Sequence, residues 1–353
     1  MKWTASVLLV MAITVSSSLI FAQNTPPQAL LALSKHDHTL AIVDPASLKV
    51  VAKVPVGNDP HEVIASADGK TAYVSNYGFG AFNTLAVVDL VAQKPLPAVD
   101  LGALRGPHGL TFVGGKTWFT AEGAKAIGSY DPVSAKIDWI MGTGQNRTHM
   151  IYVTADLQRI YTTNVSSGTV SIIEKSAART PAGPPSGQPV PPGTPPRPMV
   201  IPGGDWNETV VRVGDGSEGF DVTPDGKELW VANAHDGTIS IIAIPAKTVS
   251  ETLSANLRGA NRLKITPDGK LAFISMLGGS GVAVFDVASR KEVKRISVGH
   301  GAAGIEMQPD GSRVFVACTP DNYVAVIDLK SLAVTEHIDV GVEPDGLAWA
   351  VRR

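Results

Sequence analysis

The sequence predicts an all-β fold, a seven-bladed β-propeller with four antiparallel strands in each blade. Three observations predict it: a repeat of about 42 residues, four short alternating apolar runs inside each repeat, and two partial repeats at the chain ends. Repeats of this length are typical of propellers and solenoids, and alternation of period two is typical of half-buried strands. Four such strands make up one propeller blade.

Turn signals follow the first strand of the successive repeats. They are the stretches SADGK, VGGK, TADLQ, TPDGK (twice) and QPDGS, with turn residues at Asp68, Gly114, Asp156, Asp225, Asp268 and Asp310. The spacings are 46, 42, 69, 43 and 42 residues. Because Asp-Gly pairs favour tight hairpins, we interpret these aspartates as turn residues and not as carboxylate sites.

The expected blades can be read in chain order. Six complete blades are predicted near residues 57–101, 102–142, 143–213, 214–255, 256–298 and 299–340. The front fragment 30–57 holds three strands and the end fragment 342–353 holds one. Together they form a seventh blade in which the C-terminal strand takes the innermost position, so that no sheet edge stays open at the closure.

One repeat carries an insertion. Its spacing of 69 residues is too long, and the excess is rich in proline, with ten prolines between Pro181 and Pro202. We predict an insertion at about 176–205, between the third and fourth strands of its blade, as a solvated polyproline-like loop.

Residues 1–22 read as a secretory signal peptide, with Lys2 before a long apolar run and Ala22 near the cleavage point. An uncleaved membrane anchor is the alternative. The propeller is then residues 23–353, located in the periplasm, outside the cell or on its surface, with no stable membrane span after cleavage. A net charge of −2 does not favour nucleic acid as a partner. A protein, a glycan or a small molecule remains as the partner.

Three repeats resemble a known family. The stretches YVSN (Tyr73 to Asn76), YTTN (Tyr161 to Asn164) and WVAN (Trp230 to Asn233) follow hairpin turns and precede apolar runs such as VSII. The chain resembles the YVTN-repeat β-propellers of bacterial exported and surface proteins over nearly all of residues 23–353. The resemblance implies the fold, and propellers serve as binding proteins and as enzymes.

Histidines recur at the position that leads into the first strand of a blade. In successive blades this position holds His61, His108, His149, Glu218, Asn261, Ala303 and Asp345. The first four are candidate metal ligands, because imidazole with carboxylate suits Zn, Cu, Fe or Mn, and His108 and His149 are candidate catalytic residues. Two alternatives stay open: a histidine base beside a cation held by Glu218 and Asp345, or rings that only cap their own turns.

Other candidates share this face of the predicted propeller. Arg105, Arg147, Arg262 and Asp345 are candidate ligand-binding residues, and the arginines suit an anionic ligand. The side chains at the alternate positions of the first strands point the other way and are candidates to line the channel. They are Glu62, Tyr152, Asp221, Arg262, Lys264 and Glu306. Cys318, the single cysteine, is interpreted as a small apolar filler, with a thiolate ligand or nucleophile as the alternative.

The stretch from Gly106 to Asp131 resembles one blade of the streptogramin lyase propellers, with Trp118, Phe119, Thr120 and Glu122 carrying the match. Those enzymes use a histidine base and a divalent cation on this face, and Ala121 interrupts their usual Thr-Glu pair. No phosphate loop, haem-attachment motif or serine nucleophile elbow occurs in the sequence. We therefore expect a binding or scaffold protein, or alternatively a metal-dependent lyase, hydrolase or redox protein.

Overall fold

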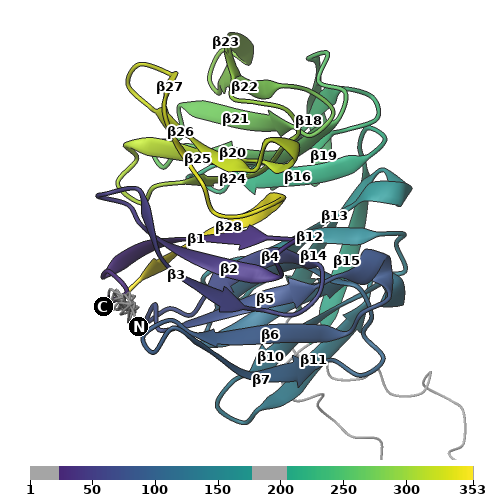
Figure 1. Ribbon diagram of the computed structural model, residues 1–353. Helices are drawn as coiled ribbons and strands as arrows, with labels where there is room; N and C mark the ends of the chain where they lie inside the picture. The colour runs from purple at the N-terminus through teal and green to yellow at the C-terminus, as the bar shows by residue number, and fades with distance from the viewer. Residues whose placement is uncertain (1–23, 177–204, 353) are drawn as a thin grey trace, which may run out of the picture.

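The computed structural model describes residues 24–176 and 205–352. Over these residues the chain forms seven four-stranded antiparallel sheets arranged in a ring, which confirms the predicted seven-bladed propeller (Figure 1). In six sheets the strands lie in chain order from the channel outward, and in the seventh the last strand of the chain lies innermost. The innermost strands of neighbouring blades contact one another around the channel.

The four strands of a blade have constant places. The innermost strands are β28 (Pro344–Val351), β4 (Pro60–Ala65), β8 (Pro107–Val113), β12 (Thr148–Val153), β16 (Ser217–Val222), β20 (Ala260–Ile265) and β24 (Ala302–Met307). The second strands are β1 (Gln28–Ser34), β5 (Thr71–Asn76), β9 (Lys116–Ala121), β13 (Arg159–Asn164), β17 (Glu228–Asn233), β21 (Leu271–Met276) and β25 (Arg313–Cys318).

The outer half of each blade is built in the same way. The third strands are β2 (Thr39–Asp44), β6 (Thr84–Asp89), β10 (Ala126–Asp131), β14 (Thr169–Lys175), β18 (Thr238–Ala243), β22 (Gly281–Asp286) and β26 (Tyr323–Asp328). The outermost strands are β3 (Lys49–Pro55), β7 (Lys94–Asp100), β11 (Lys136–Gly142), β15 (Trp206–Arg212), β19 (Thr248–Ser254), β23 (Lys291–Ser297) and β27 (Ala333–Ile338). Four short 3₁₀ turns follow second strands: η1 (Gly78–Gly80), η2 (Glu122–Ala124), η3 (Val165–Ser167) and η4 (Thr319–Asp321).

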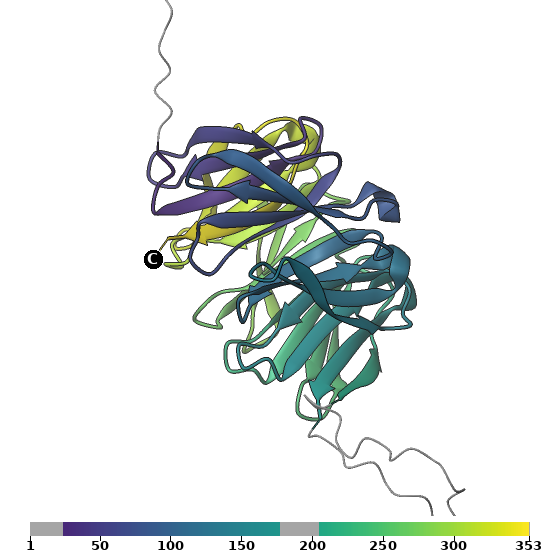
Figure 2. The same cartoon turned by 90° about the horizontal axis from the view of Figure 1, so that it is seen from below.

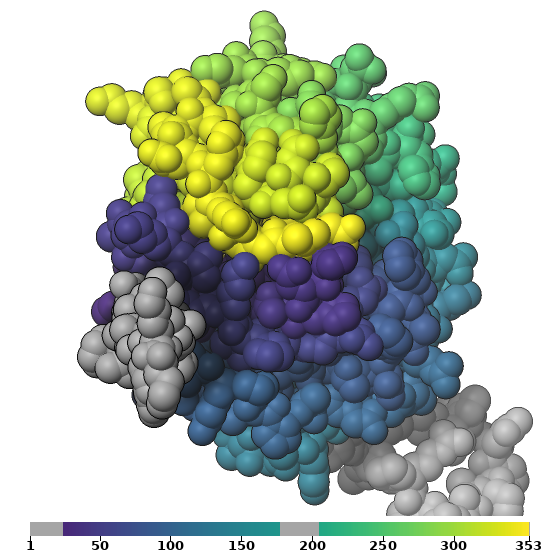
Figure 3. Space-filling model, viewed as in Figure 1, coloured from purple at the N-terminus to yellow at the C-terminus, as the bar shows by residue number. Residues whose placement is uncertain are grey.

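The seventh blade closes the ring as predicted. Strand β28 pairs with β1 in antiparallel register, with Leu30 opposite Trp349 and Ala32 opposite Leu347. In Figure 3 the yellow C-terminal segment lies directly against the purple N-terminal segment. Because β28 also contacts β4 and β24, one strand joins the first and last blades of the ring.

The hydrophobic core lies between the blades. The second and third strands are almost entirely buried, whereas outermost strands such as β7 are mostly exposed. One cluster joins Leu31 and Ile42 of the seventh blade to Val63 and Val74 of the first. Two-sided burial of this kind explains why the second and third strands read as apolar runs.

The predicted turn chemistry is present in the hairpins after the first strands. Asp225 Oδ1 accepts hydrogen bonds from Thr223 Oγ1 at 2.7 Å and from the Lys227 amide at 3.1 Å. Gly226 next to it has a φ of +69°, a left-handed conformation that glycine adopts without strain. The carboxylate is therefore used by its own turn.

The proline-rich segment connects the third strand of its blade to the fourth, because β14 ends at Lys175 and β15 begins at Trp206. Its predicted polyproline-like conformation and the predicted signal peptide at 1–22 lie outside the described residues. Within the described ranges, no helix has the length and apolar character needed to cross a membrane.

Glycine sets the spacing of the innermost strands below the channel mouth. A Cβ added at Gly109 would lie 2.5 Å from the His149 carbonyl oxygen in the next blade. We expect Gly109→Ala to lower the free energy of unfolding by about 1–3 kcal/mol, because the strands would have to separate. Denaturant unfolding measures this loss.

The matched control is Gly142→Ala, since a Cβ there would have no heavy atom within 4 Å. The control is expected to change stability by less than about 0.5 kcal/mol. Equal stability of the two variants would contradict the close strand approach.

Candidate functional site

Strand register places two rings of side chains around one mouth of the channel. In each blade the first residue of the innermost strand pairs with the last residue of the second strand, as Pro107 does with Ala121 and Thr148 with Asn164. The residues that follow these paired positions form the two rings. The first-strand ring is His61, His108, His149, Glu218, Asn261, Ala303 and Asp345, and the second-strand ring is Lys35, Tyr77, Glu122, Val165, Ala234, Leu277 and Thr319.

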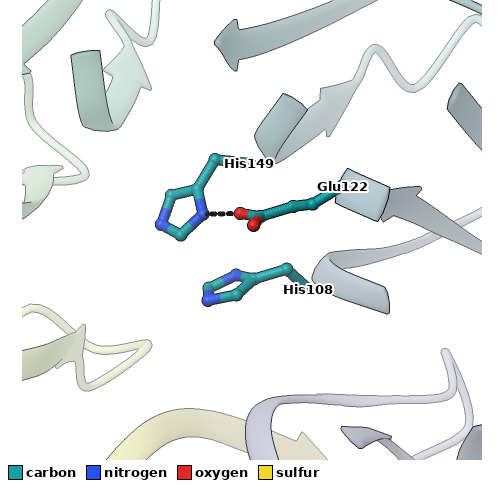
Figure 4. Close-up of side chains that lie close together, drawn as sticks. All are labelled: His108, Glu122 and His149. Atoms are coloured by element: carbon teal, nitrogen blue, oxygen red, sulfur yellow. Dashed lines mark hydrogen bonds and ion pairs between the residues drawn. The ribbon is translucent and has the colours of Figure 1, made fainter. Parts of the chain in front are cut away.

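His108, Glu122 and His149 form a buried cluster where the two rings meet. Each offers one ligand atom, and these atoms all lie within 4.8 Å of one another. His149 Nδ1 lies 2.5 Å from Glu122 Oε1, and the His108 ring lies beneath the His149 ring with centroids 3.9 Å apart (Figure 4). The three side chains come from two neighbouring blades and point at one another.

Glu218 and Arg147 complete the surroundings of His149. Its Nε2 lies 2.7 Å from Glu218 Oε2. The two groups form an ion pair, but the angles between them do not fit a hydrogen bond. Arg147 Nε lies 3.5 Å from Glu122 Oε2, and its Nη1 lies 3.5 Å from Glu218 Oε1. His149 is thus held between two carboxylates, and a partly exposed guanidinium bridges them on the solvent side.

Burial and charge set the protonation of this cluster. Burial opposes a charged ring at His149, but Glu218 and Glu122 outweigh it and raise the pKa of His149. Burial likewise opposes ionisation of Glu218, and the attraction of His149 and Arg147 outweighs it and lowers the pKa of Glu218 to about 2. His149 therefore keeps its proton to a higher pH than an ordinary histidine does, because it lies between two carboxylates.

His108 differs from His149 in charge. Burial lowers the pKa of His108 well below its usual value, and the neighbouring charge of His149 adds to this effect. His108 is therefore neutral, and a neutral imidazole has a nitrogen lone pair free to accept a proton or bind a metal ion.

Four buried polar atoms in this region have no hydrogen-bond partner among the described residues. They are His61 Nδ1, His108 Nδ1, His149 Nε2 and Glu218 Oε2, one from each of four consecutive blades. Three of them lie within ion-pair distance of a polar atom: His149 Nε2 and Glu218 Oε2 of each other, and His61 Nδ1 of Asp59. His108 Nδ1 is the exception among the four, and a buried polar atom without a partner needs a cause such as a catalytic role or an ion. These four residues are the four candidate metal ligands of the sequence analysis.

His61 and Tyr77 extend the cluster toward solvent. The His61 ring lies 5.1 Å from the His108 ring and 4.8 Å from the Tyr77 ring. His61 Nδ1 is 3.3 Å from Asp59 Oδ1, which forms a carboxylate-imidazole pair. The Tyr77 hydroxyl donates a hydrogen bond of 2.5 Å to Glu122 Oε2.

The other candidate residues lie around this centre. Asp345 is next to His61, and its Oδ2 forms an ion pair of 3.1 Å with Lys35 Nζ. Arg105 is exposed on the loop before β8, beside η2. Arg262 is buried in the channel below the mouth, where it pairs with Glu62 on the opposite side of the ring. The structure thus brings together His61, His108, His149, Glu218 and Arg147, with Asp345 at the edge.

The channel below the mouth holds a cavity of about 250 Å³. Its lining includes all six predicted channel residues, Glu62, Tyr152, Asp221, Arg262, Lys264 and Glu306. The prediction of which side chains of the first strands face the channel is therefore confirmed. Two of these residues, Glu62 and Arg262, form an ion pair across the channel.

Cys318 lies away from the site. It is fully buried in an apolar cluster, and burial raises the pKa of its thiol to about 12. The thiol is protonated at neutral pH, which agrees with the interpretation of Cys318 as a small apolar filler.

Sequence reasoning missed two members of the site. Glu122 was noticed only as part of a resemblance, and Tyr77 was not singled out. Both follow the last residue of a second strand, so aligning the second strands by the motifs that end in Asn76 and Asn164 would have found this ring.

The chain is similar to solved propellers at the level of fold. Neither the sequence profiles of known protein families nor curated proteins give a match. A protein of unknown function from Desulfotomaculum acetoxidans DSM 771 is 15% identical, with a TM-score of 0.71 over 91% of this chain and 98% of the other. A protein provisionally assigned as a 6-phosphogluconolactonase from Bacteroides fragilis NCTC 9343 is 16% identical, with a TM-score of 0.67 over 93% and 99%. Hydrazine synthase from Kuenenia stuttgartiensis is 15% identical, with a TM-score of 0.62 over 81% and 88%. At these identities the likeness is one of fold, not of function.

The two central histidines give opposite pH dependences. The folded chain does not protonate His108 near pH 6.5 and the unfolded chain does, so stability falls as the pH drops below about 6.5. The folded chain keeps the proton on His149 after the unfolded chain has lost it, so stability falls as the pH rises above about 6.5. We expect the unfolding temperature of the metal-free protein to peak near pH 6.5.

Thermal unfolding in a chelating buffer from about pH 5 to 8.5 measures this profile. His108→Gln should flatten mainly the acid limb and His149→Gln mainly the alkaline limb, because burial is the larger cause of the His108 shift. A profile that neither variant changes would contradict the assigned charges.

Proposed function

We propose that this protein binds one divalent metal ion at the buried cluster and uses it to hold and activate a small anionic molecule at the channel mouth. The observation that carries the proposal is the cluster of three buried side chains whose ligand atoms lie within 4.8 Å of one another, in which His108 Nδ1 has no hydrogen-bond partner among the described residues. Two imidazoles with a carboxylate are a donor set that suits zinc and related ions, and such sites often keep a position open.

The charges of the site also fit a cation. A divalent ion would take the place of the proton on His149 and would neutralise the buried charge of Glu122 and Glu218. His108 and His149 with Glu122 would hold the ion, and Glu218 would stay beside the other ring nitrogen of His149 as its charge partner. Arg147, with 39% of its side chain exposed, would contact the anionic end of a ligand that enters from solvent.

The reaction class that follows is that of a metal-dependent lyase or hydrolase. A bound divalent ion polarises a carbonyl or carboxylate oxygen of the substrate. His61 is the ring nearest solvent among the three histidines, and Asp59 orients it, so His61 is placed to take or give a proton. Tyr77 holds Glu122 in position through its hydroxyl.

The chain's place in a family and in the cell belongs to the same proposal. The strand-ending motifs YVSN, YTTN and WVAN support membership of the YVTN-repeat propellers, and the N-terminal sequence supports export to the periplasm or cell surface. A metal-free binding module is the second candidate, because the His149, Glu122, Glu218 and Arg147 network balances its charges without an ion.

Metal content separates the two candidates. Purified protein is stripped with a chelator, dialysed and titrated with Zn²⁺, and the bound metal is counted by mass spectrometry. One equivalent per chain is the result expected for the metal-dependent protein. Less than about one tenth of an equivalent at micromolar zinc would overturn that proposal and leave the binding module.

A further inference from the structure

The loop between the second and third strands of the first blade is longer than its six counterparts. The connections at 35–38, 122–125, 165–168, 234–237, 277–280 and 319–322 each have four residues. The connection at 77–83 has seven. Because four residues suffice in six blades of the same fold, the three extra residues are not required to build the propeller.

The extra residues present an aromatic side chain to solvent. Phe79, at the tip of the loop, is 90% exposed. Its φ is +50°, in the left-handed region, and both neighbours, Gly78 and Gly80, are left-handed as well. A left-handed conformation is sterically less favourable for a residue that carries a side chain than for glycine. The exposed ring buries little apolar area on folding, so packing within the fold does not account for an aromatic residue at this position.

The loop is fixed in place by its neighbours. The Gly78 amide donates to Asp59 Oδ2 at 2.8 Å, and the Gly106 amide donates to the Phe82 carbonyl oxygen at 2.7 Å. The Cα of Gly80 lies close against Gly106 on the loop that carries Arg105. Figure 2 shows η1 and η2 side by side at the same edge of the molecule. Phe79 therefore stands on a supported loop beside the buried cluster.

Phe79 is the outermost ring in a row that leads to the buried cluster. Its ring centroid lies 6.1 Å from that of Tyr77, and the Tyr77 ring lies 5.0 Å from the His108 ring. Asp59, which accepts a hydrogen bond from the Gly78 amide, also pairs with the His61 ring. The same side chains thus position both the loop and the site.

We propose that Phe79 is a specificity-determining residue that packs against a flat apolar group of the ligand. This inference rests on the proposed function, and it names the ligand class as an aromatic acid with a short linker. The acid end lies at the metal and Arg147, and the ring reaches outward past Tyr77 to Phe79. Ring-on-ring packing adds affinity beyond the area that it buries.

The test compares two probe acids, 4-phenylbutyrate and butyrate, by calorimetric titration of the metal-loaded and the metal-stripped protein. They share the carboxylate and the linker and differ in the phenyl ring. We expect the phenyl compound to bind about tenfold more tightly, which corresponds to about 1.4 kcal/mol. In Phe79→Ala this ratio should fall below about threefold, with butyrate binding unchanged.

Two further variants secure the interpretation. Val133→Ala removes another exposed apolar side chain, 93% exposed, on a loop between a third and a fourth strand, which lies on the opposite face, and it should keep the tenfold ratio. Deletion of residues 79–81 restores a four-residue loop and should lower the ratio as Phe79→Ala does. Melting temperatures establish that each variant is folded.

The outcomes are distinct from those of the metal titration. A Phe79-dependent ratio in either form of the protein supports the inference. Equal affinities for the two acids in both forms, no detectable binding of 4-phenylbutyrate to either form, or a ratio that survives Phe79→Ala would overturn it even where one equivalent of metal binds. Failure of metal uptake alone overturns the proposed function.

Discussion

Replacing His108 by glutamine is expected to lower the affinity for zinc at least about 100-fold while leaving the metal-free protein folded. Loss of a residue that only supports a metal ligand already costs about 10- to 100-fold in affinity, and His108 is proposed as a direct ligand. Its Nδ1 has no hydrogen-bond partner among the described residues, so the substitution breaks no polar contact at that atom. The ion pairs of His149 with Glu122 and Glu218 stay in place.

Competition with a chromophoric chelator measures the affinity, and thermal unfolding measures the fold. The matched control is His300→Gln, because His300 is exposed and also lies near a carboxylate, with Nδ1 3.2 Å from Asp321 Oδ1. The control should keep wild-type affinity. Equal zinc affinity of His108→Gln and wild type would contradict the assignment of His108 as a ligand.

Removing residues 342–353 is expected to abolish the cooperative folded state. The truncation deletes β28, which pairs with β1 and contacts the innermost strands of both neighbouring blades. It leaves the edge of β1 unpaired beside the channel and uncovers the cluster that contains Leu30 and Phe315. We expect a loss of more than about 4 kcal/mol in unfolding free energy, well above that of an ordinary substitution.

Circular dichroism melts and limited proteolysis follow this loss. The control is a deletion of residues 177–204 with a short glycine-serine linker. The residues that flank this segment are already adjacent, because the Ser176 amide donates to the Asp205 carbonyl oxygen at 2.7 Å. The control should melt at the same temperature as the full chain, although its deletion is longer than the deletion of residues 342–353. A truncated chain with a wild-type melt would show that β28 does not hold the ring closed.

The fold could be predicted from the sequence because the same pattern of strands and turns recurs in successive repeats. Hairpin turns such as the one at Asp225 fix the strand ends, and the strand parity fixes which side chains face the channel, as the cavity beside Lys264 shows. Closure followed from the two partial repeats, since neither can form a complete blade alone.

The site could be predicted only in part. The ring position of His61, His108, His149 and Glu218 follows from the repeat register, but their convergence depends on how closely neighbouring innermost strands approach. That approach depends on glycines such as Gly109, whose effect is visible only in three dimensions. Glu122 was missed because it enters the cluster from the loop after a second strand.

The most direct test of the metal site is X-ray absorption spectroscopy of the zinc-loaded protein. We expect a first shell of nitrogen and oxygen at about 2.0–2.1 Å, with the outer-shell scattering of two imidazoles, and the loss of one imidazole in His108→Gln. A shell of oxygen alone, or an imidazole signal that His108→Gln and His149→Gln both leave unchanged, would contradict the placement of the metal between His108, Glu122 and His149.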